Sequence, residues 1–240
     1  MRDAVCGLPP LLLLPGLLND AELWREPVAL LAGVADCRVG DFTRSASLEA
    51  AAAEMLAAAP PRFALAGFSL GGYVAQEMLR QAPERIGRLA LLDTSCRADT
   101  PEQARRRASA ARVAQLARGR FSGFGEHIAE RFMAPAHFRD AALVARVRAM
   151  TTRLGAEVFL RQNGWPRRDG RTVLRAFAGP ALVLCGELDQ VTPPALSEEM
   201  ATLLPDAELV RVPGSGHLAP IECPQAVAAV SYTHLRAHET

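Results

Sequence analysis

The chain has 240 residues, of which half are apolar and 22% are charged, and its formal net charge is +1 at pH 7. This length allows one sizeable core with an inserted segment. The near-neutral charge argues against a nucleic-acid-binding protein, and no apolar stretch is long enough to span a membrane. All 27 basic residues are arginine, which we interpret as a compositional bias without functional meaning.

The cysteines and the first apolar run bear on the cellular compartment. Five cysteines are scattered without a C-x-x-C pair: Cys6, Cys37, Cys96, Cys185 and Cys223. An odd, scattered set favours reduced thiols and argues against a disulfide framework or a zinc site. The apolar run 11–18 contains Pro15 and Gly16 and lacks a cleavage site, so we expect no signal peptide and a cytoplasmic protein.

Short apolar runs alternate with helical patterns along most of the chain. The runs typical of buried strands are 10–14, 37–42 (the weakest), 63–66, 89–92, 181–185 and 209–212. Helices fit 21–31, 48–59, 70–81 and 193–204, and a short one starts at Pro220. Strands that alternate with helices indicate a parallel sheet covered on both faces. We therefore predict an α/β fold with about six mostly parallel strands flanked by helices.

Residues 97–171 interrupt this alternation because they contain no strand-like run. A helix should start at the capping box Thr100-Pro101-Glu102-Gln103 and end near Gly119. Further helices fit 125–133, 141–150 and 156–162. We predict a helical lid over 97–171, inserted between strands of one discontinuous core domain that comprises 1–96 and 172–229.

The final segment, 230–240, matches the translation of a sequencing-library adaptor. We expect it to be an adaptor-derived artefact and exclude it, with His234 and His238, from reasoning about the fold. On this expectation the natural chain continues beyond Ala229 and the last helix is cut short.

Gly67-Phe68-Ser69-Leu70-Gly71 has the G-x-S-x-G pattern of a nucleophile elbow. An apolar strand precedes it and a helical pattern follows it, which places Ser69 at the apex of a sharp strand-to-helix turn. The glycines have a steric reason, since a Cβ would clash in so tight a turn. The pattern alone also arises by chance, whereas this context is specific.

A serine hydroxyl becomes nucleophilic only beside a base, and the base needs an acid that orients it. Asp189 follows the strand at 181–185, where sites form in open parallel sheets, and it is our candidate acid. Glu187 and Asp93 are alternatives, and capping or turn chemistry explains many strand-end aspartates.

His217 is the candidate base, because it follows the last strand in a glycine-containing loop that can approach the elbow. His127 and His137 lie in the predicted lid, and we expect them to be surface or packing residues.

An oxyanion that develops on the attacked carbonyl needs fixed N–H donors. We assign this role to the backbone N–H groups of Leu70, directly after the nucleophile, and of Leu17, in the loop after the first strand. That loop also reads as an ordinary turn in which Asn19 or Asp20 caps the next helix.

Together these segments resemble the α/β-hydrolase fold. The matching pieces are 14–18, 67–72, 83–85, 91–94, 186–189 and 216–217, and the resemblance extends over 11–229. It implies a serine hydrolase with the triad Ser69, Asp189 and His217 and with neither metal nor organic cofactor. The chain is most similar to small bacterial esterases and lactonases, which include 3-oxoadipate enol-lactonases and pimeloyl-carrier-protein methyl esterases.

The chain departs from the family in three places. Pro15-Gly16 stands where many relatives have His-Gly, we expect the usual first hairpin to be absent, and we expect about six strands in place of the usual eight. Serine at the elbow, in place of cysteine, argues against a dienelactone hydrolase.

We therefore predict that the protein cleaves small carboxylic esters or lactones through an acyl-enzyme intermediate. Two alternatives stay open. The same triad can serve thioester, carbon–carbon or perhydrolase chemistry, and some members of the fold bind small molecules without catalysis.

The predicted lid carries 16 arginines and 7 acidic residues, with Arg105, Arg106 and Arg107 on its first helix. One interpretation is a set of solvated helix faces. The other is steering of an anionic substrate or an acidic carrier protein towards the site. We expect the apolar lid residues to pack on the core: Val113, Leu116, Phe121, Phe124, Ile128, Phe132 and Met133.

Overall fold

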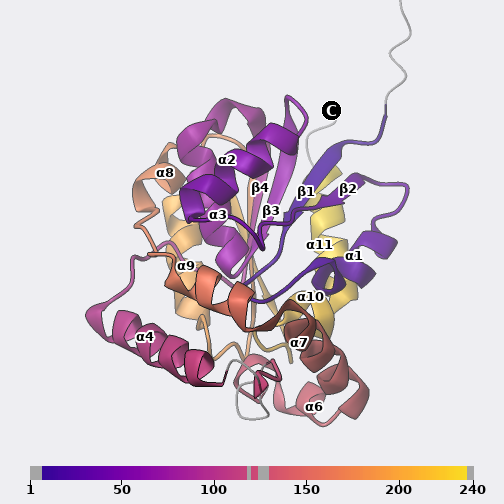
Figure 1. The fold of residues 1–240 in the computed structure, drawn as a ribbon. Helices are drawn as coiled ribbons and strands as arrows, with labels where there is room; N and C mark the ends of the chain where they lie inside the picture. The colour runs from indigo at the N-terminus through magenta and orange to yellow at the C-terminus, as the bar shows by residue number, and fades with distance from the viewer. Residues whose placement is uncertain (1–6, 118–119, 124–129, 237–240) are drawn as a thin grey trace, which may run out of the picture.

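The computed structural model describes residues 7–117, 120–123 and 130–236 (Figure 1). Most of the helix expected at 125–133 lies outside these residues, and within it residues 130–132 are helical. Cys6, Phe124, His127 and Ile128 also lie outside the described residues. In the described part, no helix combines the length and the apolar character that a membrane crossing requires.

Six parallel strands form a single sheet and confirm the predicted fold class. They are β1 (Pro10–Leu14), β2 (Asp36–Val39), β3 (Phe63–Phe68), β4 (Ile86–Leu92), β5 (Ala181–Gly186) and β6 (Ala207–Val212). Their order across the sheet is β2-β1-β3-β4-β5-β6, and every neighbouring pair is parallel. The weak run at 37–42 pairs only as far as Val39, and Phe42 beyond it is buried in the core.

The core helices follow the predicted pattern with local differences. They are η1 (Ala21–Trp24), α1 (Arg25–Leu30), α2 (Leu48–Ala58), α3 (Leu70–Gln81), η2 (Pro83–Arg85), α8 (Arg171–Ala176), α9 (Pro194–Leu203), α10 (Ala219–Glu222) and α11 (Pro224–Arg236). The segment predicted as one helix over 21–31 is divided, because Asp20 caps a short 3-10 turn before α1 begins. The helix α11 continues through residues 230–236.

Side chains on the two faces of the sheet form two apolar layers. Leu12, Leu14, Leu65, Leu91 and Val183 join the cluster that includes residues of α2, α3, α8 and α9. Their neighbours Leu11, Leu13, Ala66, Leu92 and Leu184 join the cluster with η1, α10 and α11. Figure 1 shows these helices on opposite sides of the sheet. Burial on both faces explains why the strands read as continuous apolar runs.

The segment 97–171, hereafter the insertion, connects β4 to α8 and contains α4 (Pro101–Leu116), α6 (Pro135–Phe138) and α7 (Ala141–Gly164). These three helices gather at one end of the sheet (Figure 1). The predicted capping box is present, since Thr100 and Gln103 exchange hydrogen bonds of 2.8 and 3.2 Å. The two helices predicted over 141–150 and 156–162 form one kinked α7, interrupted at Gly155 with φ of 76°.

Helix α4 contacts the rest of the molecule through a narrow face. Ala114 is buried, and the guanidinium of Arg107 donates to the carbonyls of Asn163 and Trp165 at 2.6 and 2.8 Å and pairs with Asp99. The prediction that Val113 and Leu116 pack on the core is wrong, because they are 67% and 84% exposed.

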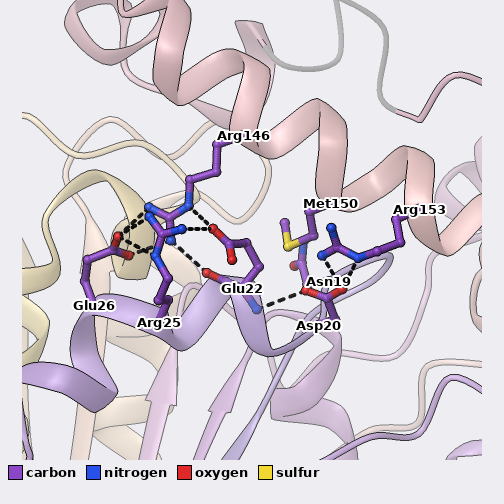
Figure 2. A network of polar contacts seen from close by, with 8 residues as sticks. All are labelled: Asn19, Asp20, Glu22, Arg25, Glu26, Arg146, Met150 and Arg153. Carbon is purple, nitrogen blue, oxygen red and sulfur yellow. Dashed lines mark hydrogen bonds and ion pairs between the residues drawn. The ribbon is translucent and has the colours of Figure 1, made fainter.

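Arginines of α7 pair with acidic residues of the core. Figure 2 shows Arg146 between Glu22 and Glu26, with nitrogen–oxygen distances of 2.5 Å to each, and Arg153 beside Asp20 at 2.6 Å. Other arginines of the insertion also pair with core acids: Arg97 and Arg171 with Glu199, and Arg168 with Glu49 and Glu77. The excess of arginines in the insertion therefore helps to attach the insertion to the core, which the sequence did not suggest.

Candidate active site

Ser69 lies between β3 and α3, as predicted, with φ of 50° and ψ of −113°. A non-glycine residue rarely adopts a positive φ, so this backbone must be held by its surroundings. The N–H of Ser69 donates to Leu92 O at 3.0 Å. A Cβ at Gly67 would lie 2.5 Å from Gly71 O, and one at Gly71 would lie 2.5 Å from Leu14 O. Glycines are therefore required on both sides of the turn.

His217 lies in the loop after β6 and is fully buried. Its Nε2 is 3.0 Å from Ser69 Oγ. The imidazole contacts two aromatic rings, with centroid distances of 5.2 Å to Phe68 and 5.1 Å to Phe132. The backbone N–H of His217 also donates to Phe132 O at 2.9 Å, so the insertion helps to hold this loop.

Asp189 completes the hydrogen-bonded series, since its Oδ2 is 2.8 Å from His217 Nδ1. Oδ1 accepts from the N–H groups of Val191 and Thr192 at 2.7 and 3.0 Å, and Oδ2 accepts from Thr192 Oγ1 at 2.6 Å. Burial alone would raise the pKa of Asp189, but the charge of His217 and the hydrogen bonds from His217 and Thr192 outweigh it. The pKa of Asp189 is therefore lowered, and the carboxylate form is favoured.

The two expected oxyanion donors are the backbone N–H groups of Leu70 and Leu17. Leu70 is the first residue of α3, and the first N–H groups of a helix have no acceptor within it. Leu17 precedes Leu18, whose φ is 56° and whose N–H donates to Gln162 Oε1 at 2.9 Å. Gln162 belongs to α7, so the insertion also fixes the loop that carries Leu17.

The residues considered as alternatives for the acid and the base lie in other surroundings. Glu187 is exposed and does not join this series of hydrogen bonds. Asp93 is fully buried close to Asp189 and His217. His137 lies in α6 with its Nδ1 2.9 Å from Glu222 Oε2, in keeping with the packing role expected for it.

Glu222 is a buried residue whose role the sequence did not suggest. Its Oε2 accepts from the N–H groups of Gly216 and Ala134 at 3.1 and 2.7 Å, and its Oε1 accepts from Leu218 N–H at 2.9 Å. It therefore holds the backbone on both sides of His217. The only signal in the sequence is a carboxylate five residues after the histidine. Gln162 and Thr192 were missed as well, because their contacts depend on how distant segments meet.

Among the described residues, one group of side chains has the spacing of metal ligands. Asp93, Asp189 and His217 offer ligand atoms within 4.8 Å of one another. The Nδ1 of His217 already bonds to Asp189, so hydrogen bonding accounts for this cluster. The four described cysteines are free thiols and do not form a cluster of this kind.

Apolar residues of the insertion lie beside the loop after β1 that carries Leu17 and Leu18. They form a cluster with Leu17 and Leu18 that comprises Ala114, Phe121, Phe132, Leu154, Val158, Phe159 and Leu160. An open pocket of about 530 Å³ is lined by Pro15 and Asn19 of the same loop and by polar and apolar residues that include Asp41, Phe42 and Arg153.

The chain is similar to several known proteins in sequence and in fold. A pimeloyl-[acyl-carrier protein] methyl ester esterase of Aromatoleum aromaticum is 30% identical over 80% of this chain and 81% of its own length. A protein of Mycobacterium tuberculosis named as a non-heme bromoperoxidase is 30% identical over 74% of this chain and 69% of its own. The structure of a thermophilic esterase from Thermogutta terrifontis matches with a TM-score of 0.82 and 30% identity over 98% of this chain and 91% of that one. Residues 40–224 match the family described as alpha/beta hydrolase fold, and the chain belongs to this family.

Proposed function

We propose that the protein is a serine hydrolase that cleaves small carboxylic esters or lactones through an acyl-enzyme on Ser69. The observation that carries this proposal is the unbroken series from Ser69 Oγ to His217 Nε2 at 3.0 Å and from His217 Nδ1 to Asp189 Oδ2 at 2.8 Å. Each member has the chemistry that its position requires: a nucleophile, a base and an acid that orients the base.

In the acylation step Ser69 Oγ attacks the substrate carbonyl while His217 Nε2 takes the serine proton. His217 then gives this proton to the leaving alkoxide, and Asp189 stabilises the imidazolium and maintains its orientation. The N–H groups of Leu70 and Leu17 stabilise the oxyanion. Water activated by His217 attacks the acyl-enzyme, which releases the acid and regenerates Ser69.

The apolar cluster beside Leu17 and Leu18 suggests where the acyl group binds. Leu17 and Leu18 meet Phe132 and Phe159 there, and Phe132 also touches the His217 ring. We propose that the insertion acts as a lid, that these side chains cover the acyl group, and that they exclude water around the ester.

An acidic carrier protein is a candidate for the rest of the substrate. The relative from Aromatoleum aromaticum is named for an acyl-carrier-protein ester, and the outward face of α4 carries the exposed residues Arg105, Arg112 and Leu116. These residues share one helix face because they are seven and four positions apart. Arg107 is excluded from this role, because its guanidinium holds α4 in place.

The steering hypothesis can be tested with substitutions at exposed positions that should not disturb the fold. Arg105→Glu combined with Arg112→Glu should reduce kcat/KM for an acyl-carrier-protein ester at low salt, and the effect should disappear at high salt. Hydrolysis of a neutral p-nitrophenyl ester should not change. Equal slowing of both substrates would contradict the hypothesis.

The central proposal is tested with Ser69→Ala and p-nitrophenyl butyrate. Without the nucleophile, kcat should fall by about a thousandfold or more, while the urea unfolding midpoint stays near that of the wild type. An ester and lactone panel then defines the acyl group. Undiminished turnover by the alanine variant would refute the proposed mechanism.

Perhydrolysis is a second candidate function, favoured by the relative named as a non-heme bromoperoxidase. In this reaction hydrogen peroxide, in place of water, attacks the acyl-enzyme and releases a peracid. Supplying peroxide with an acetate ester and measuring peracid formation separates the two reactions, and both should be lost in Ser69→Ala.

A further inference from the structure

Asp93 is a buried carboxyl group that the proposed reaction does not use. It directly follows β4, with φ of 44°, and its side chain is fully buried. Oδ1 accepts from the N–H of Gly186 at 2.7 Å. Oδ2 is buried as well, and no donor from the described residues reaches it. An ionised carboxylate in such a place would leave one charged oxygen without a partner, which is costly.

Two other buried carboxyl groups nearby have all the donors that Asp93 lacks. Asp189 accepts from Val191, Thr192 and His217, and both of its oxygens are used. Both oxygens of Glu222 accept backbone N–H groups. Asp93 therefore differs from the other buried carboxyl groups at this edge of the sheet, because it alone among the three has an oxygen without a hydrogen-bond donor.

Asp93 also lies against a negative charge. One side-chain nitrogen or oxygen atom of each of Asp93, Asp189 and His217 lies within 4.8 Å of the corresponding atoms of the other two. Burial raises the pKa of Asp93 well above its usual value, and the charge of Asp189 raises it further, against the opposing effect of the Gly186 N–H. The pKa of Asp189 shifts in the opposite direction. The pKa values of adjacent carboxyl groups move apart in this way when one group keeps its proton and the other is ionised.

We propose that Asp93 is a neutral carboxylic acid in the folded protein and that its O–H donates to the Asp189 carboxylate, which positions Asp189 for His217. Asp93 is thus a positioning residue that acts through Asp189 and lies outside the series of Ser69, His217 and Asp189. The inference uses the role proposed above for Asp189, but the protonation state of Asp93 can be measured without any substrate.

The charged and titratable groups around Asp93 come from each element packed on it: Cys185 of β5, Asp189 after β5, His217 after β6, Glu222 of α10 and Cys223 after α10. None of the neighbours in this set is an arginine, so no fixed positive charge favours ionisation of Asp93.

The first experiment compares unfolding of the wild type and Asp93→Asn between pH 4 and pH 7. The amide keeps an acceptor for Gly186 N–H and a donor for Asp189. In the wild type the folded state holds a proton that the unfolded state releases above its ordinary pKa. The wild type therefore loses stability relative to the variant as pH rises, by up to about tenfold in the unfolding constant per pH unit. Asp93→Asn should unfold at higher urea than the wild type at pH 7, and the difference should vanish near pH 4.

Asp189→Asn is the matched control, since the lowered pKa of Asp189 predicts the opposite sign. There the wild type should be favoured above the ordinary pKa of aspartate, and its advantage should be lost as pH falls. If Asp93→Asn instead unfolds at lower urea than the wild type at pH 7, or shows no dependence on pH, Asp93 is ionised and the proposal is wrong.

Two further measurements guard against a variant that does not fold. The infrared spectrum of wild-type protein with labelled aspartate should show the carbonyl stretch of a protonated carboxylic acid at pH 7. In active protein, Asp93→Asn should leave the acid limb of the kcat/KM profile in place, whereas Asp93→Leu, which has no donor, should lower kcat by about tenfold at unchanged KM. Absence of the infrared band in folded wild type overturns the proposal even if the esterase activity is confirmed. A band without any esterase activity leaves the proposal standing and refutes the proposed function.

Discussion

The edge of the sheet that carries Ser69, Asp189 and His217 and the insertion beside it are held by different interactions. At the edge, buried side chains bond to backbone N–H groups, as Asp189 bonds to Val191 and Thr192. The insertion instead attaches in part by arginines, such as the largely buried Arg146 and the exposed Arg153, which pair with core carboxylates. The first kind of contact is buried and shielded from salt. The second is screened by ions and has a smaller net energy.

This difference predicts which substitutions the protein should tolerate. A substitution at the edge disturbs close-packed backbone and buried polar groups, so its effect should be large and independent of salt. A substitution in the attachments of the insertion should have a smaller effect that depends on ionic strength. The next three predictions follow this order of magnitude.

The largest effect is expected for Gly71→Ala in the elbow. Its Cβ would lie 2.5 Å from Leu14 O and 2.6 Å from Pro15 O, and backbone atoms cannot move aside as a side-chain end can. We expect a loss of about 3 kcal/mol in the free energy of unfolding, measured by urea titration. Gly164→Ala in α7 is the control, since no atom lies within 4 Å of the place that its methyl group would take. An elbow variant as stable as the wild type would show that the turn is looser than these close contacts imply.

Gln162→Leu tests the point at which the two regions meet. The leucine cannot accept the N–H of Leu18, so the loop that carries the proposed Leu17 donor loses a support. We expect kcat to fall by about tenfold with little change in KM, because an oxyanion donor acts mainly in the transition state. Unchanged kcat, or a loss confined to KM, would argue against this role for Gln162.

The smallest effect is expected for Arg146→Met, which removes the ion pairs to Glu22 and Glu26 shown in Figure 2. Because Arg146 is only 15% exposed and makes several charged hydrogen bonds, we expect a loss of about 1 kcal/mol at low salt. The loss should shrink as salt is added. Arg148→Met, two residues away on the exposed side, should be neutral, and equal losses for the two variants would count against the pairing.

The core could be predicted closely from the sequence because its signals are local. Helix α3 matches the predicted range 70–81, and the strands were visible as apolar runs bounded by turn residues. Ser69, Asp189 and His217 could be chosen together because the carboxyl ends of parallel strands meet at one edge, and the structure brings these three side chains into contact.

The insertion could be predicted only in part, because its attachments join residues far apart in the chain. Arg107 resembled its exposed neighbours in the sequence, yet it is bound to carbonyls near residue 165. Leu116 resembled a core residue but is 84% exposed, since a short amphipathic pattern does not reveal which face meets the core. Glu222 and Gln162 share this difficulty, as their partners are backbone N–H groups that only the folded chain brings near.

Labelling with a fluorophosphonate probe tests the central claim most directly, because the probe reacts with a serine only when a base activates it. Peptide mass spectrometry of the labelled wild type should place the adduct on Ser69, and His217→Gln should label about a thousandfold more slowly. A folded wild type that stays unlabelled, or that carries the adduct on another residue, would contradict the account.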